Sequence, residues 1–596
     1  MNEREFGYLF QARRHLHQPP ETHSNDFKPI NYLVSAYILP PLALDLLEGY
    51  VGTQALDSAM HAYYQKWQFR HPQPGDLQQS LEEALEQDLD WLFEGLIGSK
   101  GHIDYAITKV EDQSQSYRVE VANRGTIESP VALSIVRGDS VVATVWSKGF
   151  SGKRTLRIDK AAGDLLVIDA ERHAPELYRR NNDYRLDGPL KWVRRPDFTF
   201  LPAATNDTRG NLLWSPALGW NNYDKLMAGL VLSNHTLPEQ RLEWRAAPMY
   251  GFGSQDLAGL GALHYNIYPR NQGVFHRIRL GLTGQRFHSD ILSRFNEEEP
   301  IGYERLQPYL RFDFAPDPTD NTYARLQLRG IWLRAETLDF RSPNEPLARD
   351  YETQWLQEAR FTFEQRRKIN PYQWSAALEH QAFENVFGEE DRYVKAAFEI
   401  DWNFNYSKRE AIHLRLFGGY FLYSTFRESQ VVSPVAFNLS SNGNNDYRFD
   451  DLYLGRTETS GIWSQQISRR DGGFKVPLPL NTGRGRSNNF ILAANFKADL
   501  PSQAMLGIPL KPYLDIGYFS DQHSIGDDPS FSDQFMWNGG LMLELFDERL
   551  AVYFPLISSK NIADQLEARG DYFTRIGFQL DLQRMNPWKL LDRQEL

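Results

Sequence analysis

Most of the chain after residue 195 alternates apolar and polar residues with a period of two. Segments such as 276–283, 324–332 and 490–499 place mainly apolar side chains on one face and polar or charged ones on the other. Such alternation is typical of β-strands, and these runs are longer than the average globular strand of about 5–6 residues. Strands of about 9–11 residues with one apolar and one polar face are typical of transmembrane barrels. We therefore predict a transmembrane β-barrel over residues 195–583.

The connections between these strands favour the same interpretation. Residues 296–301 and 546–550 are short, whereas residues 427–456 form a long polar stretch rich in asparagine and serine. Outer-membrane barrels have short turns at one end and longer loops at the other. The pattern predicts roughly 14–16 strands, followed by a C-terminal extension at 584–596. A large soluble all-β domain is the alternative.

Two shorter regions precede the barrel. In residues 1–100 apolar side chains recur at helical spacing, for example at Leu42, Leu46 and Leu47, which predicts a short α-helical domain. The period changes to two at His102, and residues 101–188 read as short strands separated by turn residues. This favours a small β-sandwich of immunoglobulin or fibronectin type. The predicted fold class is therefore multidomain: a helical domain, a small β-sandwich and a large antiparallel β-barrel of outer-membrane type.

Composition narrows the possible functions. The 596 residues carry a formal charge of −12, with scattered lysine and arginine, so there is no electrostatic basis for a nucleic-acid partner. The absence of cysteine excludes disulfides and thiolate metal sites. The chain has no run of about 18 consecutive apolar residues, so the sequence predicts no helical membrane span. The opening MNEREFGYLFQARRH has charge where the apolar region of a signal peptide would lie.

Two polar clusters are candidates for metal sites. His15, His17 and His23 form the densest histidine cluster, but no carboxylate lies at a helical offset, so a solvated loop is expected rather than a zinc site. Asp450 and Asp451, with the polar residues 442–446, could offer oxygens to calcium. Because nothing in the sequence fixes a loop geometry there, we expect an exposed loop. No metal ligand and no cofactor-binding residue is predicted.

The stretch NYLVSAYILPPLAL, residues 31–44, places Tyr32 and Tyr37 before an apolar helical run. With LDSAMHAYYQKWQFRHPQPGDL at 56–77 and DLDWLFEGL at 88–96, it resembles the part that follows the zinc site in the aminopeptidase N family of gluzincin metallopeptidases. The resemblance implies that Tyr37 is a catalytic residue that donates a hydrogen bond to the oxyanion of the tetrahedral intermediate.

Later segments extend the resemblance over nearly the whole chain. VANRGTIESPVALSI, residues 121–135, resembles the domain that follows the helical region in long family members of Bacteroidetes type. Those members can end in an outer-membrane barrel, which residues 217–234 and the alternating segments after them resemble.

The zinc site of this family is missing from the chain. The family has H-E-x-x-H and then a further glutamate upstream of this tyrosine, and the 36 residues before Tyr37 contain no H-E-x-x-H for such a glutamate to follow. Without these ligands the chain alone cannot hold zinc, the cofactor of the complete family, or activate a water molecule. On this chain we therefore expect Tyr37 to serve core packing rather than catalysis.

Three functions remain open at this point. The first is the membrane-anchoring C-terminal part of an aminopeptidase N-like peptidase that is inactive by itself. The second is an active peptidase with a peptide substrate, completed by an upstream metal-binding chain. The third is an outer-membrane transport or assembly barrel with periplasmic or surface binding modules. In each case we expect the bacterial outer membrane as the location, its lipid as a partner, and no nucleic acid.

Overall fold

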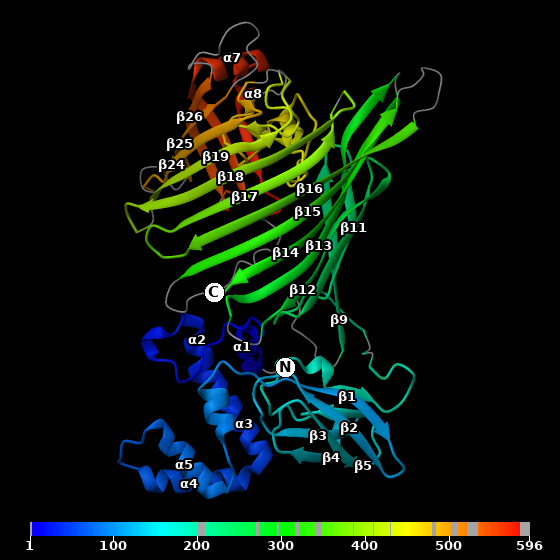
Figure 1. Ribbon diagram of the computed structural model, residues 1–596, viewed down its shortest axis with the longest axis vertical. Coiled ribbons are helices and arrows are strands. Elements are labelled where there is room, and N and C mark those ends of the chain that lie inside the picture. The colour runs from blue at the N-terminus through cyan, green and yellow to red at the C-terminus, as the bar shows by residue number, and fades with distance from the viewer. Residues whose placement is uncertain are drawn as a thin grey trace. The chain divides into compact units, whose positions relative to one another are not determined.

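In the computed structural model the chain folds into two compact units, which are described separately (Figure 1). Unit 1 comprises Met1–Trp214, Ser233–Glu243 and Tyr268–Asn271, and unit 2 comprises Ser215–Leu232, Trp244–Ile267 and Gln272–Leu596. The structure describes residues 3–583, with gaps at 193, 195, 201–208, 270–272, 295–296, 316–320, 340–347, 386, 409, 430, 479–483, 502–508, 521–533 and 547.

Unit 1 begins with helices where helical periodicity predicts them. Their bounds are α1 (Glu3–Ala12), η1 (Ser24–Asp26), α2 (Pro29–Leu33), η2 (Val34–Ile38), α3 (Leu39–Val51), α4 (Thr53–Trp67), α5 (Pro74–Leu85) and η3 (Trp91–Ile97). Helix α3 ends at Gly52, whose φ of +88° suits a residue without a side chain. Helix α5 begins with a capping box between Gln73 and Asp76, which satisfies two backbone donors of the first turn. The expected helical region is confirmed.

A two-sheet sandwich comes after the helices. The strands are β1 (Tyr105–Asp112), β2 (Ser116–Asn123), β3 (Val131–Arg137), β4 (Ser140–Ser147), β5 (Lys153–Asp159), β6 (Leu165–Ile168) and β7 (Asp183–Arg185), with η4 at Arg179–Asn181. One sheet has the order β1-β2-β5 and the other β4-β3-β6-β7. A single cluster of buried apolar residues runs from the helices, with Leu42 and Leu46, into the sandwich, with Val121 and Leu133. The helices and the sandwich therefore share one core.

Buried charges join α1 to the sandwich. The Arg179 guanidinium donates to a Glu5 carboxylate oxygen at 2.7 Å and to Asp169 Oδ2 at 2.9 Å. Close by, Glu176 is fully buried and accepts a hydrogen bond from the Tyr105 backbone N–H at 2.6 Å. Burial raises the pKa of Glu176 to about 8. Glu176 is therefore largely protonated at neutral pH, which avoids an uncompensated buried charge beside the Glu5–Arg179 pair.

One helical stretch, Pro29–Val51, is long and apolar enough to cross a membrane by length and composition alone. Within unit 1, 44% of its most apolar window is buried, and Leu39, Leu42, Leu46 and Leu47 belong to the shared core. Core helices of soluble domains pass the same test, so length and composition are a weak indication of a membrane span here.

The remaining strands form a closed barrel. They are β8 (Pro196–Phe200), β9 (Gly210–Asn221), β10 (Lys225–Ser233), β11 (Leu242–Gly251), β12 (Asp256–Ile267), β13 (Phe275–Arg294), β14 (Glu297–Phe314), β15 (Thr322–Asp339), β16 (Ala348–Gln365), β17 (Tyr372–Glu384), β18 (Glu390–Asn405), β19 (Ala411–Ser424), β24 (Phe490–Ala498), β25 (Leu510–Phe519), β26 (Phe535–Leu545), β27 (Leu550–Ser558) and β28 (Gly577–Leu580).

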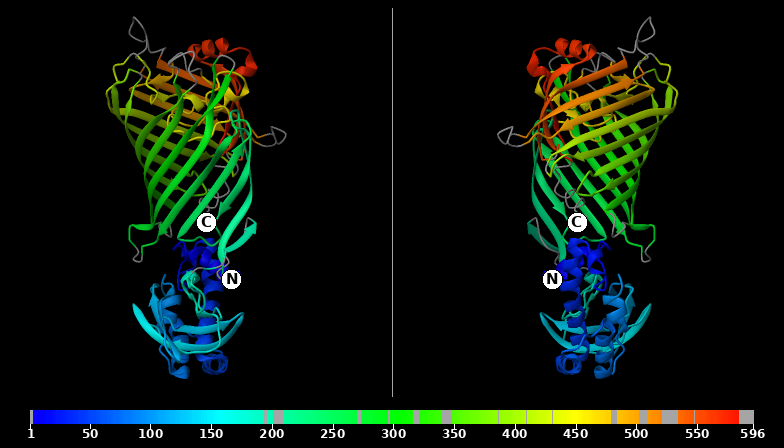
Figure 2. Two further views of the ribbon diagram at one scale, coloured as in Figure 1. Left: turned by 90° about the vertical axis from the view of Figure 1, so that its right-hand side faces the viewer. Right: turned by 90° about the vertical axis from the view of Figure 1, so that its left-hand side faces the viewer.

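Seventeen strands thus close one sheet among the described residues, slightly more than the sequence predicts. Neighbours from β12 to β19 pair antiparallel, as do β24 to β28, whereas the short β8 pairs parallel with β9. Figures 1 and 2 show the long strands side by side in one curved wall. Closure leaves no unpaired sheet edge in lipid, which is the condition for a strand-built membrane span. The predicted fold class, with an outer-membrane-type barrel, is confirmed.

The alternation sorts side chains between the two faces of the wall. Leu280, Leu328 and Leu378 are exposed on the outer face. Arg279 and Glu358, which have the opposite parity on the same wall, are buried inside. Aromatic residues on the outer face cluster near one end, where Trp374 contacts Phe361 and Phe398. An apolar outer band with aromatic residues at its margin suits a lipid environment.

A lipid-facing charge tests this assignment. Leu328→Arg places a charge on the outer face of β15 and should destabilise the folded barrel by about 2–4 kcal/mol if it lies near the bilayer midplane. Gln373→Arg, at an inward position of β17 between Glu364 and Asp401, should cost under about 1 kcal/mol because its cross-strand neighbours are acidic. Urea titration of the folded barrel in lipid vesicles measures both. Equal costs for the two variants would contradict the assignment of faces.

Candidate functional site

The strongest candidate site is a long segment folded into the barrel. Residues 425–489, called here the inserted segment, connect β19 to β24. The segment contains two small ladders, β20 (Phe437–Asn438) with β23 (Arg486–Ser487) and β21 (Ser441–Asn442) with β22 (Ile467–Ser468), and two short helices, η5 (Gly443–Asn445) and η6 (Ile462–Gln465). Figure 2 shows its yellow ribbon at the barrel end that carries α7 (Lys560–Arg569) and α8 (Tyr572–Arg575), drawn in red.

Asp450 is the most heavily engaged charge of this segment. Its carboxylate accepts hydrogen bonds from Arg305 of β14 at 2.5 Å and from Arg329 of β15 at 2.7 Å. Arg470, also in the inserted segment, donates to the other oxygen at 3.2 Å. Only 6% of Asp450 is exposed. A buried carboxylate among arginines is strongly held, because removal of either side leaves an unpaired buried charge.

A second set of contacts lies on β17 and β18, beyond the neighbouring strand β16. Arg448 of the inserted segment donates to Glu379 of β17 at 2.8 Å, and the Tyr447 hydroxyl bonds to the same carboxylate. Lys395 of β18 donates to the backbone oxygen of Val435 at 2.6 Å. The wall residues Arg329, Glu379 and Lys395 all occupy inward positions of their strands. The inserted segment is therefore bonded to several neighbouring strands through polar side chains.

Apolar contacts anchor another part of the segment. Residues 435–439 and 474–478, called here the root, contribute Phe437, Leu439 and Phe474 to a buried cluster with strands β18, β19 and β24–β26. Two glycines of the wall make room for it. A Cβ on Gly419 would lie 2.4 Å from the Phe437 ring, and one on Gly517 would lie 2.4 Å from Leu439. Only glycine allows this close approach of side chain to strand.

Another part of the segment, residues 447–470, is called here the tip and lies beside two cavities. One cavity of about 590 Å³ is lined by wall residues Arg360 and Glu399 and by tip residues such as Asp450. The other, of about 430 Å³, is lined by Lys497 and Glu544 among others. Arg469 lines both cavities and forms ion pairs with Asp401 of β18 and with Glu548, the latter at 2.8 Å. Charge thus holds much of the tip, and Phe449, Leu452 and Ile467 add apolar contacts with the wall.

The tip also reaches the two ends of the strand series. The Asn222 backbone N–H, in the β9–β10 turn, donates to Leu454 O at 2.7 Å. On the other side Gln466 forms an isolated bridge with Phe578 of β28 and donates to Leu580 O at 3.4 Å. Strand β28 has only four residues paired with β27. The tip therefore contacts and supports the barrel wall next to β28, its shortest strand.

This arrangement corrects the sequence interpretation of residues 427–456. The sequence predicts an exposed outer loop, and the stretch instead folds inward, with Asn442, Asn445, Asp446 and Asp450 buried. The calcium hypothesis has no support, because the Asp450 oxygens accept from arginines. Polar residues are misleading here because the barrel interior is itself polar. The alternation along β15 and β17 already places Arg329 and Glu379 inside the barrel. Because buried charges need partners of opposite sign, this pattern could have indicated that a charged segment folds inward.

Tyr37 lies outside this site, on η2 in unit 1. It is 60% exposed and Tyr32 is 46% exposed, so the expected role of Tyr37 in core packing is wrong. The two hydroxyl groups lie 3.5 Å apart. Both tyrosines are exposed because they lie on the outer face of this helical stretch, whose opposite face, with Val34 and Leu39, packs into the core. The catalytic role implied by the resemblance stays a prediction.

The three histidines near the N-terminus are not brought together as ligands. His17 is buried, which corrects the expected solvated loop, and burial together with the nearby His102 lowers its pKa to about 4. His23 is exposed and caps η1, where it accepts from the Asn25 backbone N–H at 3.3 Å. His15 stacks on the Tyr268 ring with centroids 4.8 Å apart.

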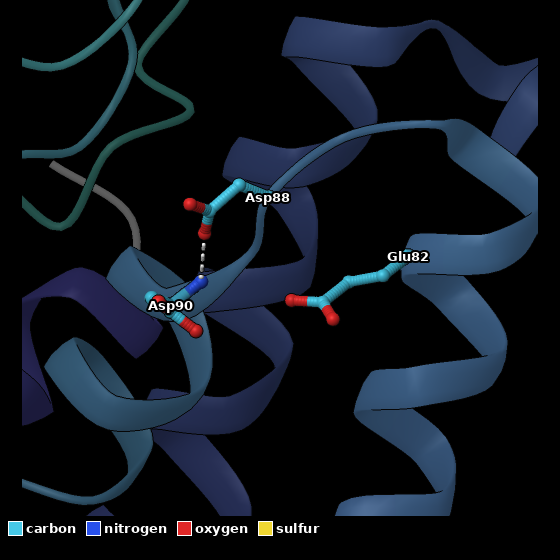
Figure 3. A group of neighbouring side chains, drawn as sticks. All are labelled: Glu82, Asp88 and Asp90. Carbon is cyan, nitrogen blue, oxygen red and sulfur yellow. Dashed lines mark hydrogen bonds between the residues drawn. The ribbon is translucent and has the colours of Figure 1, made fainter.

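Among the described residues, the one group of three possible ligands within close range is Glu82, Asp88 and Asp90 (Figure 3). Asp88 accepts from the Asp90 backbone N–H at 2.9 Å, and Glu82 accepts from the Leu89 backbone N–H at 3.0 Å. These bonds order the turn between α5 and η3. An acidic cluster with such a structural use needs no metal ion.

Comparison with known proteins gives only distant likenesses. No protein-family model matches the chain, and no curated protein matches it in sequence. Among solved structures, BamA from Haemophilus ducreyi lacking POTRA domains 1–3 is similar, with 11% identity, a TM-score of 0.30, and coverage of 60% of this chain and 70% of that one. CdiB from Acinetobacter baumannii is similar at 9% identity and a TM-score of 0.28, over 73% of this chain and 63% of its own.

The FrpB iron transporter from Neisseria meningitidis is similar at 8% identity and a TM-score of 0.22, over 75% of this chain and 66% of its own. Likenesses at this level say nothing about what the chain carries or binds. None of the comparisons supports the resemblance to the aminopeptidase N family.

Asp450→Asn tests the charge network. The change removes the buried negative charge that Arg305, Arg329 and Arg470 share, and loss of one member of such a network costs about 3–5 kcal/mol. Local opening of the tip should rise about 100-fold or more. Limited trypsin digestion of the folded barrel should then cleave at Arg448, Arg456 or Arg469 correspondingly faster. Asp350→Asn, at an exposed aspartate of β16, is the control; equal cleavage of both variants would contradict the role of Asp450.

Proposed function

We propose that the chain is a barrel of the bacterial outer membrane with a transport or assembly function, closed at rest by its inserted segment. The closed strand order and the apolar outer face support the location. The observation that carries the function is the tip, which lies in the barrel interior and is held there by ion pairs to Arg305, Arg329 and Glu379.

The different contacts of root and tip favour a tip that moves rather than an inserted segment that blocks the barrel permanently. The root packs Phe437, Leu439 and Phe474 against the wall, and its release would expose apolar surface to water. The tip is held by largely buried hydrogen bonds and ion pairs, and Phe449, Leu452 and Ile467 also pack against the wall. Its release therefore requires water from the adjoining cavities, or a charged solute, to replace the ion-pair partners. Cavities of about 590 and 430 Å³ already adjoin it. The tip can therefore swing while the root stays in place.

A simple membrane anchor explains these features less well. An anchor needs only the apolar outer face, and its interior is most stable when apolar side chains fill it, because buried ion networks add little net stability. A wall with Arg329, Glu358, Glu379 and Lys395 facing inward suits a hydrated passage. The anchor of an aminopeptidase N-like peptidase remains the second proposal; its support is the sequence resemblance of residues 31–96.

Conductance across a planar lipid bilayer tests the proposed function. The intact chain should conduct little, whereas a variant in which a short glycine–serine linker replaces residues 447–470 should form a steady pore. Asp450→Asn should open intermittently, and Arg392→Ala, at an exposed strand end, should behave as the intact chain. Folding of each variant is checked by heat-modifiable gel mobility. A folded variant without the tip that conducts no more than the intact chain would contradict the proposal.

A further inference from the structure

The edge strands of the sandwich in unit 1 are protected unequally. Strands β1 and β5 flank one sheet and β4 and β7 the other. Figure 1 labels β1, β4 and β5. Charged residues such as Lys109 and Glu111 lie on β1, Lys153 and Arg157 lie on β5, and β7 has only three residues. Strand β4, with the sequence SVVATVWS, has eight residues and neither a charge nor a proline. Charges, proline and shortness are the usual protection of an edge against pairing with another chain.

The unprotected edge is accessible. Among the described residues β4 pairs with β3 alone. Val141 is 38% exposed and Val142 is 43% exposed, and Thr144 is also exposed. An edge strand presents a row of backbone N–H and C=O groups on its free side, and the chemistry that satisfies this row is another extended backbone.

One end of β4 carries two further recognition features. Trp146 contacts the Tyr50 ring with centroids 5.5 Å apart, and Tyr50 lines a pocket of about 540 Å³ between α3, α4 and α5. Val51, Ala59 and Leu85 line the same pocket. Ser58 and Gln87 add polar groups to this lining, so a large side chain such as phenylalanine fits against its apolar part only.

The second feature at this end of β4 is positive charge. Arg154 donates to Ser147 Oγ at 3.1 Å and to Lys148 O at 2.9 Å, which places both cations at the end of the strand. No carboxylate of the described residues forms an ion pair with either. An acidic group would complete this end.

We propose that β4 is the docking edge for an extended segment of a partner polypeptide. The segment adds to the sheet as a new strand beside β4, places a large apolar side chain in the pocket next to Tyr50, and sets an acidic residue against Lys148 and Arg154. Backbone pairing supplies the affinity, while the pocket and the two cations set the register and the specificity. The inference goes beyond the proposed function, since it concerns unit 1 and holds whether or not the tip moves.

The probe is a fluorescent peptide, DFTVTVTV, which places aspartate and phenylalanine at the end that meets residues 146–148 in an antiparallel addition. Its binding to the full chain in detergent micelles is followed by fluorescence anisotropy. We expect saturable binding, and at least 10-fold weaker binding when alternate peptide nitrogens are methylated. The same loss is expected for Val142→Lys combined with Thr144→Lys, which introduces the missing edge charges. Thr155→Lys, at an exposed position of β5, should leave binding unchanged.

Two further variants separate the contributions of pocket and charge. Ala84→Trp, at an exposed alanine that lines the pocket, should weaken the peptide about 10-fold by filling the space for its phenylalanine. A peptide with lysine in place of aspartate should bind more weakly at low salt, and this difference should vanish at high salt. An unchanged near-ultraviolet circular dichroism spectrum shows that the exposed substitutions leave the fold intact.

Three results would overturn the proposal. The first is no saturable binding of the peptide, and the second is equal affinity of the methylated peptide, which would remove backbone pairing from the interaction. The third is self-association of the full chain that the two β4 lysines abolish, which would assign the edge to a second copy. Each of these leaves the conductance of the barrel unaffected, so failure here is distinguishable from failure of the proposed function.

Discussion

Charge inside the barrel is balanced between the wall and the inserted segment, and the rest of unit 2 depends on that balance. Arg305 and Arg329 of the wall form ion pairs with Asp450 of the inserted segment, and Glu379 of the wall forms an ion pair with Arg448. These charges are buried or partly buried, so each side depends on the other, or on water that takes its place, for charge balance. The tip adjoins cavities of about 590 and 430 Å³ that can supply water to its charges, while Phe449, Leu452 and Ile467 pack against the wall.

Much of the fold could be predicted from the sequence, because membrane strands and soluble helices obey simple periodicities. Alternation at residues 324–332 gives β15, with Leu328 outside and Arg329 inside. Recurrence of Leu42, Leu46 and Leu47 gives the buried face of α3. These patterns arise from local geometry and from one boundary between apolar and polar surroundings.

The candidate site escaped prediction because its residues face surroundings that the sequence does not display. Residues 442–451 look like a hydrated loop, and only the inward charges of β14–β17 make a polar interior for them. Tyr37 shows the reverse error, since an aromatic residue in an apolar run is expected inside and is 60% exposed. Gly419 and Gly517 mark the path of the root, although in the sequence they resemble any glycine within a strand.

The claim that the inserted segment is packed within the barrel is tested most directly by hydrogen–deuterium exchange of the intact chain in detergent micelles. Amides of the root, residues 435–439 and 474–478, and of the tip, residues 447–470, should exchange as slowly as those of β15–β18, over minutes to hours, because they are bonded or buried beside the wall. Complete exchange of this segment within seconds, with the strands still protected, would contradict the account and return residues 427–456 to an exposed loop.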